Sequence, residues 1–562
     1  MKRLISCVLA LLYVMAGFAS GTWILHGKEY RVDTLYHAYI GPGTTQTSIK
    51  LAGPVNLRVF YTTTDLKNEN VDVRAIKHKD TLTGLGTVSN AAESHSTSNR
   101  SYFAGINADF FSSSMPCGIT VVDGEVYCSD QASGWSLFGI DANKIPYSGG
   151  GDFYVKLTAP DYSTAELSAM NLERETNGLV LYSSRKGANT GTDGNGSEVV
   201  LTPGATVRMR VQGNPNHAGS MPILDNGYIL SGSGTKESFV SNLSEGDVVE
   251  VRCAIRFNGF TGGKIQQALG GCPMLVSGGK VLDTENALDH LTSAQPRTAV
   301  GYNAEKNKLV MLVADGRSSI SVGPISKVLA DIMIYAGCSE AMNFDGGGSS
   351  TFYVKGEGVI NQPSDGSERS VTDGLYLSTD APQNDVTITT IRFMDYAKTL
   401  NQGDAYTPVI YGYNQYGVLV DRNVEGVTLS CGSSLGTITN DGTTLNASGS
   451  GTHMLTAGYG NLTTTLSVTV IGESGISSVD NSQALMIYPN PVEQGTAVSV
   501  DLQEVSDALL SVCRSDGVLV SRIAVNAGEK SVSFDTSEWD RGMYILNVIQ
   551  DKNVKSLKLI VK

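Results

Sequence analysis

Short alternations of apolar and polar residues, separated by turn-forming residues, run through most of the chain. Thr351-Phe-Tyr-Val354, Val386-Thr-Ile-Thr-Thr-Ile391 and Leu466-Ser-Val-Thr-Val470 are examples of such short segments. A period of two places successive side chains on opposite faces of a β-strand, whereas an α-helix repeats every 3.6 residues. Stretches with the helical period are rare, so the pattern predicts a mostly β protein with a few helices.

One segment, residues 325–336, has the character of a helix. Pro324 suits the first helical position because its missing N–H has no partner there in any helix. Gly337 suits the position after the last turn, where the backbone often needs a positive φ. We therefore expect a helix over residues 325–336 that stops at Gly337.

Length and linkers divide the chain into several predicted parts. At 562 residues the chain is too long for a single hydrophobic core. Polar stretches at 380–384 and 471–475 are predicted linkers, since short alternating strands lie on both sides of each. The expected parts are a signal peptide at 1–20, an N-terminal segment of strands at 21–54, an α+β catalytic domain at 55–380, and two small β-sandwich modules at 385–472 and 479–562.

The first residues have the features of a secretory signal peptide. Lys2 and Arg3 precede an apolar run at 4–18, and small residues follow it at 17–20. That run is too short for an ordinary membrane span. No later stretch reaches the roughly 18 uninterrupted apolar residues that a spanning helix needs. We expect an exported chain, secreted or attached at the cell surface, without a membrane span.

Charge and histidine positions exclude several function classes. The formal net charge is −14, and no basic stripe with interleaved aromatic residues occurs, so nucleic acid is not an expected partner. The seven histidines all lie outside the polar motifs described below, which argues against a histidine-based triad or a histidine-rich zinc site. They are His26, His37, His78, His95, His217, His290 and His453.

Seven cysteines would follow the signal peptide, an odd number that leaves at least one thiol unpaired. Cys117 and Cys128 bracket an Asp-Gly turn, so a hairpin could bring them near each other. In the register of a two-residue turn, however, Cys128 would face Ile119. A disulfide between these two cysteines is left open. No Cys-x-x-Cys or Cys/His spacing indicates structural zinc.

The motif Asn343-Phe-Asp-Gly-Gly-Gly-Ser-Ser350 is the most unusual stretch of the chain. Consecutive glycines cost backbone entropy, so they indicate positive φ angles or a close approach to the backbone. Successive N–H groups in such a turn can also form an anion-binding concavity. A Walker loop is excluded because Gly348, and not lysine, precedes Ser349. The alternative without function is a tight glycine-rich hairpin.

Four further polar motifs occur along the predicted catalytic domain. At least two of them directly follow apolar, strand-like runs, and strand ends next to turns are where sheets present sites. The four motifs are Asn107-Ala-Asp-Phe-Phe111, Arg297-Thr-Ala299, Asp315-Gly-Arg317 and Arg369-Ser-Val-Thr-Asp373. Taken singly, each could be an ordinary turn or strand cap.

Together and in this order, the motifs resemble those of the phosphodiester glycosidase family over about residues 55–380. Relatives often have Gly where Ala108 stands and Pro where Ser370 stands. The resemblance implies hydrolysis of a sugar-1-phosphodiester at its glycosidic bond, with N-acetylglucosamine (GlcNAc)-α-1-phosphate as the type of group. A phosphoglycan or sugar phosphate is the implied substrate partner.

The residue types suit that chemistry. Guanidinium groups bind phosphate oxygens in pairs, and the oxocarbenium-like sugar needs a carboxylate as nucleophile or base. The candidate catalytic residues are Asp345, Asp315 and Asp109. The candidate substrate-binding residues are Asn107, Arg297, Arg317, Asn343, Gly346, Gly347, Gly348, Ser349, Arg369 and Asp373.

Two other functions and one cofactor stay open at the level of the sequence. A surface adhesin or glycan-binding module would use the same glycine-rich loops without turnover. A phosphodiesterase would cleave the P–O bond, normally with a metal ion. No cofactor is identified by motif, although aspartate and carbonyl oxygens could hold calcium.

The C-terminal segment, residues 479–562, resembles the type A sorting domain of the type IX secretion system. Ile487-Tyr-Pro-Asn-Pro-Val492 begins the resemblance, and Arg541-Gly-Met-Tyr-Ile-Leu546 continues it into a lysine-rich end. This resemblance implies the secretion machinery as a partner. The segment at 385–472 is similar to a bacterial immunoglobulin-like sandwich.

Overall fold

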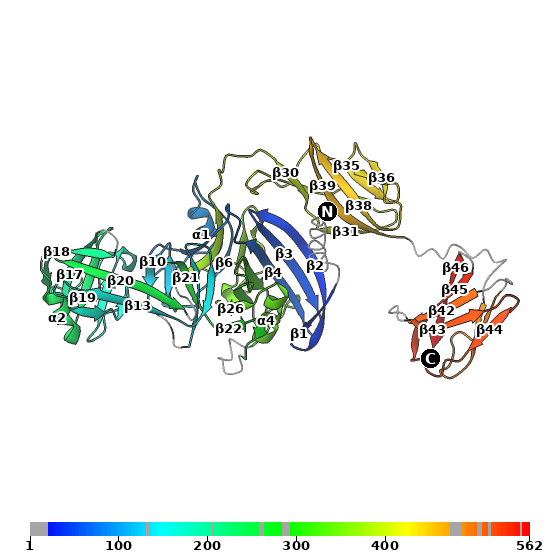
Figure 1. Cartoon of the computed structure of the whole chain (residues 1–562), viewed down its shortest axis with the longest axis horizontal. Helices are drawn as coiled ribbons and strands as arrows, with labels where there is room; N and C mark the ends of the chain where they lie inside the picture. The colour runs from blue at the N-terminus through cyan, green and yellow to red at the C-terminus, as the bar shows by residue number, and fades with distance from the viewer. Residues whose placement is uncertain are drawn as a thin grey trace, which may run out of the picture. The chain divides into compact units, whose positions relative to one another are not determined.

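A computed structural model of the chain describes residues 21–130, 132, 134–204, 207–257, 264–283, 293–472, 486–502, 508–514, 519–550 and 553–562. The predicted signal peptide, residues 1–20, lies outside the described residues. The chain divides into two compact units, residues 1–470 and 471–562. Strands make up 52% of the protein and helices 6%, which confirms the prediction of a mostly β fold with few helices (Figure 1).

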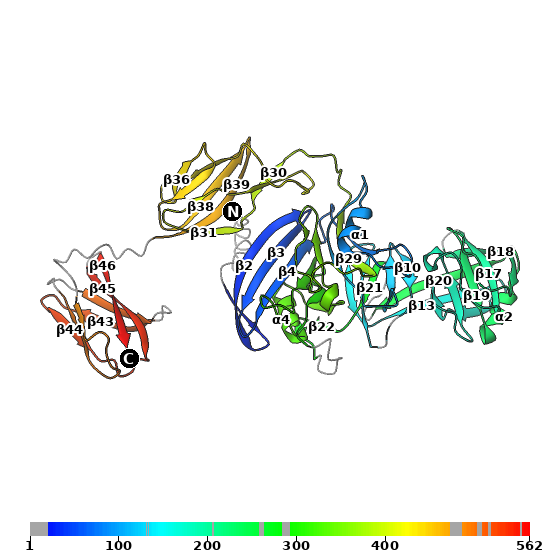
Figure 2. The same ribbon diagram turned by 180° about the vertical axis from the view of Figure 1, so that it is seen from behind.

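The centre of the first unit is a nine-stranded sheet built from distant parts of the chain (Figures 1 and 2). Its order is β1 (Gly21–Leu25), β2 (Lys28–Gly41), β3 (Thr44–Ala52), β4 (Asn56–Asp65), β25 (Lys308–Ala314), β24 (Arg297–Tyr302), β26 (Glu340–Asn343), β22 (Met274–Ser277) and β23 (Lys280–Val281). Residues 21–54, expected to form a separate segment, therefore lie in the same sheet as the strands of three site motifs.

A five-stranded sheet packs against the nine-stranded sheet. Its order is β28 (Gly358–Val359), β27 (Phe352–Val354), β6 (Ser101–Asn107), β29 (Asp373–Thr379) and β5 (Asp72–Lys77). The two sheets share one core, in which Met311 and Val300 meet Ile106 and Leu375. All seven residues of β6 and of β29 are buried, as expected for central strands covered on both faces.

Helix α4 (Ser326–Tyr335) covers the other face of the nine-stranded sheet and agrees with the predicted helix to within one residue at each end. Leu329, Ile332 and Met333 pack against strand residues such as Leu312, because these helical positions fall on one face. Gly337 follows the helix with a φ of +98°, the left-handed conformation expected at this position.

Two further sheets stand between β6 and β24 in the sequence and share a second core. The five-stranded one runs β10 (Glu125–Cys128), β9 (Thr120–Val122), β21 (Ile265–Gly271), β11 (Ser136–Asp141) and β12 (Pro146–Gly149). The eight-stranded one runs β14 (Thr164–Glu166), β13 (Gly151–Thr158), β20 (Val248–Phe257), β18 (Arg208–Asn216), β17 (Ser197–Pro203), β19 (Tyr228–Gly232), β16 (Leu179–Tyr182) and β15 (Ala169–Met170).

The predicted hairpin between Cys117 and Cys128 is present as β9 and β10. A bulge shifts its register, so that Cys128 pairs with Thr120 instead of Ile119. Both cysteines are free thiols, as are the other five among the described residues.

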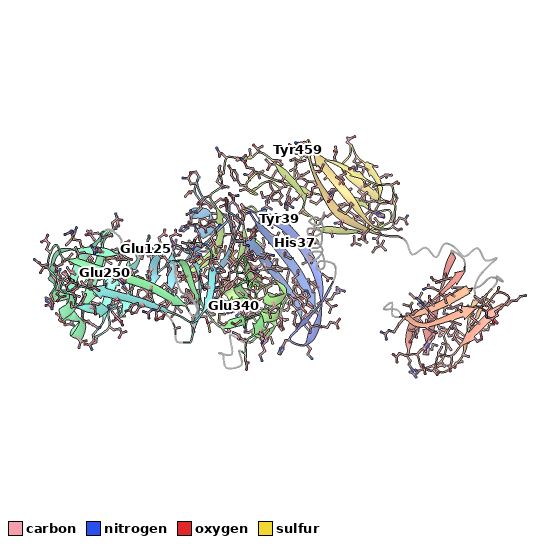
Figure 3. The ribbon with its side chains drawn as sticks, in the orientation of Figure 1. His37, Tyr39, Glu125, Glu250, Glu340 and Tyr459 are labelled. Carbon is pink, nitrogen blue, oxygen red and sulfur yellow. The ribbon has the colours of Figure 1, made fainter. Side chains whose placement is uncertain are left out.

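Residues 390–471 form three small sheets around a separate core. Polar contacts join this part to the preceding one. Tyr413 Oη donates to the carbonyl of Tyr39 at 2.8 Å. Arg422 forms a 2.7 Å ion pair with Glu357 and donates to the carbonyl of Lys355 at 2.7 Å. Figure 3 labels Tyr39 on β2. The immunoglobulin-like assignment stays a prediction for this part.

The second unit consists of two antiparallel sheets with a core of their own. One runs β40 (Met486–Tyr488), β41 (Val498–Asp501) and β44 (Ser531–Phe534); the other runs β43 (Leu519–Val525), β42 (Ala508–Arg514), β45 (Gly542–Gln550) and β46 (Asn553–Val561). Trp539 and Tyr544 pack together in this core. Among the residues that the structure describes, no helix has the length and apolar character needed to cross a membrane.

Candidate active site

The glycine-rich loop at 345–350 crosses from one central sheet to the other. It leaves β26 of the nine-stranded sheet and enters β27 of the five-stranded sheet through a single 3₁₀ turn, Gly347–Ser349. Gly347 has a φ of +61°, and its N–H donates to the carbonyl of Pro296 at 2.9 Å. A methyl group at Gly346 would lie 2.8 Å from that same carbonyl. The loop therefore needs glycine for its path and for its close approach to the strand beside it.

Asn107, at the end of β6, connects this loop by hydrogen bonds to strands β6 and β24. Its Nδ2 donates to the carbonyl of Asp345 at 2.8 Å. Its Oδ1 accepts from Thr298 Oγ1 at 2.7 Å and from the N–H of Thr351 at 3.1 Å. The side chain is fully buried. These three hydrogen bonds are all to protein groups, so the geometry favours positioning of Asp345 over the substrate contact predicted from the sequence.

Two of the predicted arginines lie against the backbone of the loop. A methyl group built at Gly347 would be 3.0 Å from Nη2 of Arg317, and one built at Gly348 would overlap Nη2 of Arg369. Arg369 also donates to Ser349 Oγ at 3.4 Å. Both arginines are exposed. The accessible side of the loop thus carries two guanidinium groups beside closely spaced backbone amides.

Each of these arginines is oriented by a neighbour. Arg369 forms a 2.6 Å ion pair with Asp365, four residues earlier. Arg317 donates through Nε to Gln295 Oε1 at 2.7 Å. Such fixed orientation reduces the rotamer entropy that an anion would otherwise have to overcome on binding.

Arg297, the third predicted arginine, is buried at the start of β24. Its Nη2 donates to the carbonyl of Ser293 at 2.5 Å, and its Cδ would lie 3.8 Å from a methyl group at Gly346. Burial, together with the nearby charge of Arg317, lowers the pKa of Arg297 to about 10. The aliphatic part of the side chain therefore lies beside Gly346 of the loop.

Asp345 is the half-buried carboxylate of the loop. Burial raises its pKa from the usual 3.8 to about 6, although the Ser349 hydroxyl, the Gly346 N–H and the charge of Arg369 oppose that rise. The Asp345 N–H donates to the carbonyl of Ala108 at 2.8 Å. Asp345 is consequently held between the two sheets with a pKa close to the range in which catalytic carboxylates work.

Asp109 and Asp373 form a fully buried carboxyl pair beside Asp345. The N–H of Asp109 donates to Asp373 Oδ1 at 2.9 Å. Asp109 Oδ2 accepts from Gly118 and Gly270 at 3.0 and 3.2 Å. Its Oδ1 has no hydrogen-bond partner among the described residues. Burial raises the pKa of both groups; the charge of Asp373 raises that of Asp109 further, whereas Lys77 opposes the rise at Asp373.

Asp315 is separate from these three carboxylates. Its Oδ1 accepts from the N–H of Gln362 at 2.9 Å and from Asn361 Nδ2 at 3.3 Å, and its charged neighbour is Arg58. Burial raises the pKa of Asp315 to about 6. Asn361 in turn donates to the carbonyl of Ser350. Asp315 therefore supports the far end of the loop, which makes it a weaker catalytic candidate than its motif indicated.

The side-chain amide of Asn343 also binds protein backbone. Its Nδ2 donates to the carbonyls of Cys272 and Phe344 at 2.8 and 2.5 Å. Its buried Oδ1 has no partner among the described residues.

Two residues that sequence reasoning missed adjoin the carboxylates. The half-buried thiol of Cys117 has its pKa raised to about 11 by burial and by Asp109, Asp130, Asp345 and Asp373. Lys77 is buried at the end of β5, donates to the carbonyl of Thr372 at 3.0 Å, and carries a positive charge next to Asp373. Neither residue belongs to a recognisable motif, so only the fold reveals them.

Within the described parts of the chain, no group of three His, Cys, Asp or Glu side chains is placed to hold a metal ion. The carboxyl groups of Asp109, Asp373 and Asp345 instead accept the hydrogen bonds from backbone N–H and hydroxyl groups described above.

Comparison with known proteins identifies two families along the chain. Residues 195–378 match the phosphodiester glycosidase family, and residues 486–562 match the secretion system C-terminal sorting domain. Both resemblances predicted from the motifs are confirmed. Four of the five motifs fall inside the first match, whereas Asn107 and Asp109 precede it.

Individual relatives are distant. The SPβ prophage-derived uncharacterized protein YomE of Bacillus subtilis is 40% identical over 88 residues, which cover 16% of this chain and 13% of that protein. A hypothetical protein from Synechocystis shares 16% identity over 60% of this chain and 62% of its own, with a TM-score of 0.48. The zebrafish N-acetylglucosamine-1-phosphodiester α-N-acetylglucosaminidase catalytic domain, auto-inhibited by its pro-peptide, shares 13% identity over 61% of this chain and 87% of its own, with a TM-score of 0.34.

Proposed function

We propose that this chain, with its phosphodiester glycosidase domain and its type IX secretion sorting domain, is an exported hydrolase of sugar-1-phosphodiesters. It would cleave the glycosidic bond of a GlcNAc-α-1-phosphate type of substrate, release the sugar and leave a phosphomonoester. The observation that carries the proposal is the glycine loop, which has Arg317 and Arg369 against its backbone and a cluster of three carboxyl groups at its base.

The two sides of the loop suit the two halves of the substrate. Phosphate oxygens would accept hydrogen bonds from the guanidiniums of Arg317 and Arg369, whose planar donors match an anionic tetrahedral group. Arg297, buried beside Gly346, would add to the positive potential around the loop. As the glycosidic bond breaks, negative charge grows on the leaving phosphate, and these cations stabilise it.

The carboxyl groups would act on the sugar half. In its ionised form Asp345 stabilises the oxocarbenium-like carbon, as nucleophile or as base toward water. The buried carboxyl of Asp373 helps raise the pKa of Asp345, so the Asp109 and Asp373 pair would tune the proton affinity of that carboxylate. Over the whole reaction, the oxygen of water bonds to the anomeric carbon, the C1–O bond breaks, and the bridging oxygen leaves with the phosphate.

Isotope position tests which bond breaks. Hydrolysis of a GlcNAc-α-1-phosphodiester in oxygen-18 water should place the label in the anomeric hydroxyl of the released sugar, read by mass spectrometry. Unlabelled GlcNAc incubated alone in the same water measures spontaneous exchange. Label in the phosphate would reject the glycosidase assignment and favour the phosphodiesterase alternative.

A second candidate function is a surface glycan-binding protein or adhesin without turnover. The β-sandwich parts and the sorting domain favour this function because they suit cell-surface display. It predicts saturable binding of the phosphodiester with no released sugar. Purified protein that binds the substrate but yields no product over a long incubation would establish this second candidate.

Removal of the C-terminal unit should leave the chemistry intact. A chain ending at 470 retains every site residue, and the deleted unit has its own core. A chain ending at 380 also loses the Tyr413–Tyr39 and Arg422–Glu357 contacts. We expect unchanged kcat/KM for both truncations, with a lower Tm for the shorter chain. A folded but inactive chain 1–380 would show that the middle module completes the site.

A further inference from the structure

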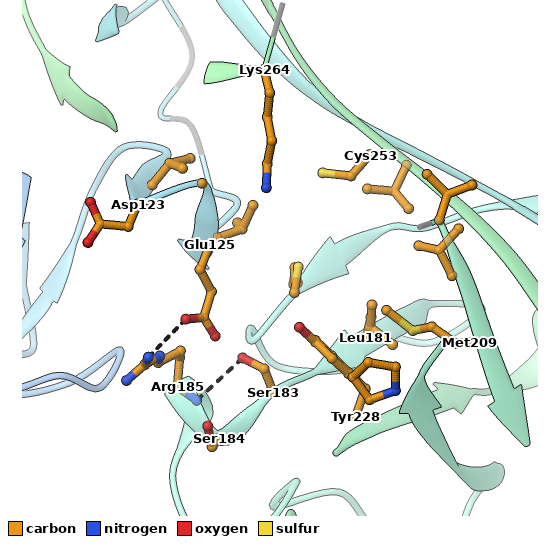
Figure 4. A pocket seen from close by; sticks show the side chains of 18 of the residues that line it. Asp123, Glu125, Leu181, Ser183, Ser184, Arg185, Met209, Tyr228, Cys253 and Lys264 are labelled. Carbon is orange, nitrogen blue, oxygen red and sulfur yellow. Dashed lines mark hydrogen bonds and ion pairs between the residues drawn. The ribbon is translucent and has the colours of Figure 1, made fainter. Parts of the chain in front are cut away.

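A cavity of about 760 Å³ lies between the β9–β10 hairpin and the eight-stranded sheet (Figure 4). None of the predicted site residues lines it, so it is distinct from the glycine loop. Its volume falls within the range of roughly 300–1,000 Å³ that is usual for small-molecule sites. The cavity is therefore large enough to take a small molecule, separate from the substrate of the proposed hydrolysis.

The base of the cavity is apolar. It is formed by side chains of the core shared by the two sheets, and those at least nine-tenths buried include Met170, Leu181, Val251 and Ile255. Met209 adds a flexible, partly buried thioether. Such a surface gains free energy by taking up hydrocarbon, because apolar area leaves water on both partners.

Two of the acidic groups at the rim already hold cations. Glu125 forms a 2.9 Å ion pair with Arg185, as Figure 4 shows. Asp123 forms an ion pair with Arg74 and accepts from Gln267 Nε2 at 2.8 Å. These carboxylates are therefore poor partners for an incoming cationic ligand.

Lys264 is different, because within the described residues its ammonium group has no ion-pair partner. A methyl group at Gly124 would lie 2.8 Å from Lys264 Nζ, and Figure 4 shows this amine directed into the cavity. The nearby Cys253 has a pKa raised to about 11 by burial despite the charge of Lys264, so the thiol does not neutralise it at pH 7. The remaining charged residues that line the cavity, Arg208 and Asp225, are of opposite sign.

We propose that this cavity binds an amphiphilic carboxylate, with its hydrocarbon on the Met170–Leu181–Met209 base and its carboxylate on Lys264. The charge complementarity selects an anion, and the apolar base selects a hydrocarbon body over a sugar. This binding site is independent of the proposed hydrolysis and would persist in an inactive variant.

Calorimetric titration of the full chain with decanoate and decanol separates charge from hydrocarbon. We expect saturable, one-to-one decanoate binding that is at least about tenfold tighter than decanol binding, the usual size of a charge-assisted contact. Lys264→Met should remove this preference while leaving decanol affinity unchanged, and Lys264→Arg should keep it. Met209→Gln should weaken both ligands alike.

Alkylation of Cys253 supplies an independent reading. Bound decanoate should slow its reaction with N-ethylmaleimide, followed by peptide mass spectrometry, while the half-buried Cys431 and Cys513 react unchanged. Equal affinity for decanoate and decanol, a Lys264→Met variant that binds decanoate normally, or no protection of Cys253 would each overturn the proposal. So would the absence of saturable binding.

Discussion

Replacing Asp345 by Asn should reduce kcat by at least about a thousandfold, because the neutral amide cannot stabilise a developing positive charge at the sugar. The backbone contacts of residue 345 with Ala108 and Asn107 do not use the carboxylate, so the loop should keep its path. Initial rates on a GlcNAc-α-1-phosphodiester measure the loss. A variant with near-normal turnover would exclude Asp345 from catalysis.

The same substitution should not destabilise the protein at neutral pH. A carboxyl group whose pKa rises from 3.8 to about 6 on folding stabilises the fold in its protonated form. That contribution is complete below about pH 4 and is lost as the pH rises through 6. Since Asn resembles the protonated acid, the variant should be more stable than wild type at pH 8, by about 1–2 kcal/mol in urea unfolding.

The proposed activity of the wild-type protein should follow the opposite trend. Because ionised Asp345 is required, kcat/KM should increase as the pH rises through about 6. Asp315→Asn is the matched comparison, since Asp315 has a similarly raised pKa of about 6 but lies apart from the carboxyl cluster. We expect it to keep turnover within about tenfold. Equal loss in both variants would make Asp315 a catalytic group as well.

Gly348→Ala should lower kcat/KM by about a hundredfold or more with little change in Tm. The new methyl group would occupy the space of the Arg369 guanidinium and the Asp365 carboxylate, which are the ends of flexible, exposed side chains. Both can move away at little cost in stability. Arg369 would then leave its place beside the loop, and misplacement of a binding group by about 1 Å can cost a hundredfold in rate.

Gly346→Ala provides the contrasting case. Its methyl group would meet the backbone carbonyl of Pro296 at 2.8 Å, which cannot rotate away, so we expect a clear fall in Tm. Differential scanning calorimetry and initial rates on the two variants distinguish the effects. Gly348→Ala with normal activity would show that Arg369 does not contact the substrate.

Sequence alone predicted the motifs of the site because each lies at a strand end or a turn, where local pattern is informative. The helix before residue 337 and the glycine-rich loop could be predicted for the same reason. The sequence also indicated the two families that residues 195–378 and 486–562 match.

The hydrogen-bond partners of the motif residues could not be predicted. Asn107 and Asn343 have side chains suited to sugar hydroxyls, yet tertiary packing commits their amide groups to backbone carbonyls. Asp315, like Asp345, lies close to the end of a strand. Its carboxylate, however, accepts hydrogen bonds from Asn361 and Gln362. These hydrogen-bond partners depend on which distant segments of the chain become neighbours in the fold, and a local sequence pattern does not indicate this.

The order of strands in the nine-stranded sheet has a consequence for the time at which activity arises. Arg58, on β4, donates its backbone N–H to Ser321, 263 residues later, and β4 pairs with β25 along its length. Closing so long a loop is slow, and proteins rich in contacts between distant residues fold slowly. The glycine loop connects this sheet to its partner, so a nascent or translocating chain should hydrolyse nothing until both ends of the domain have met.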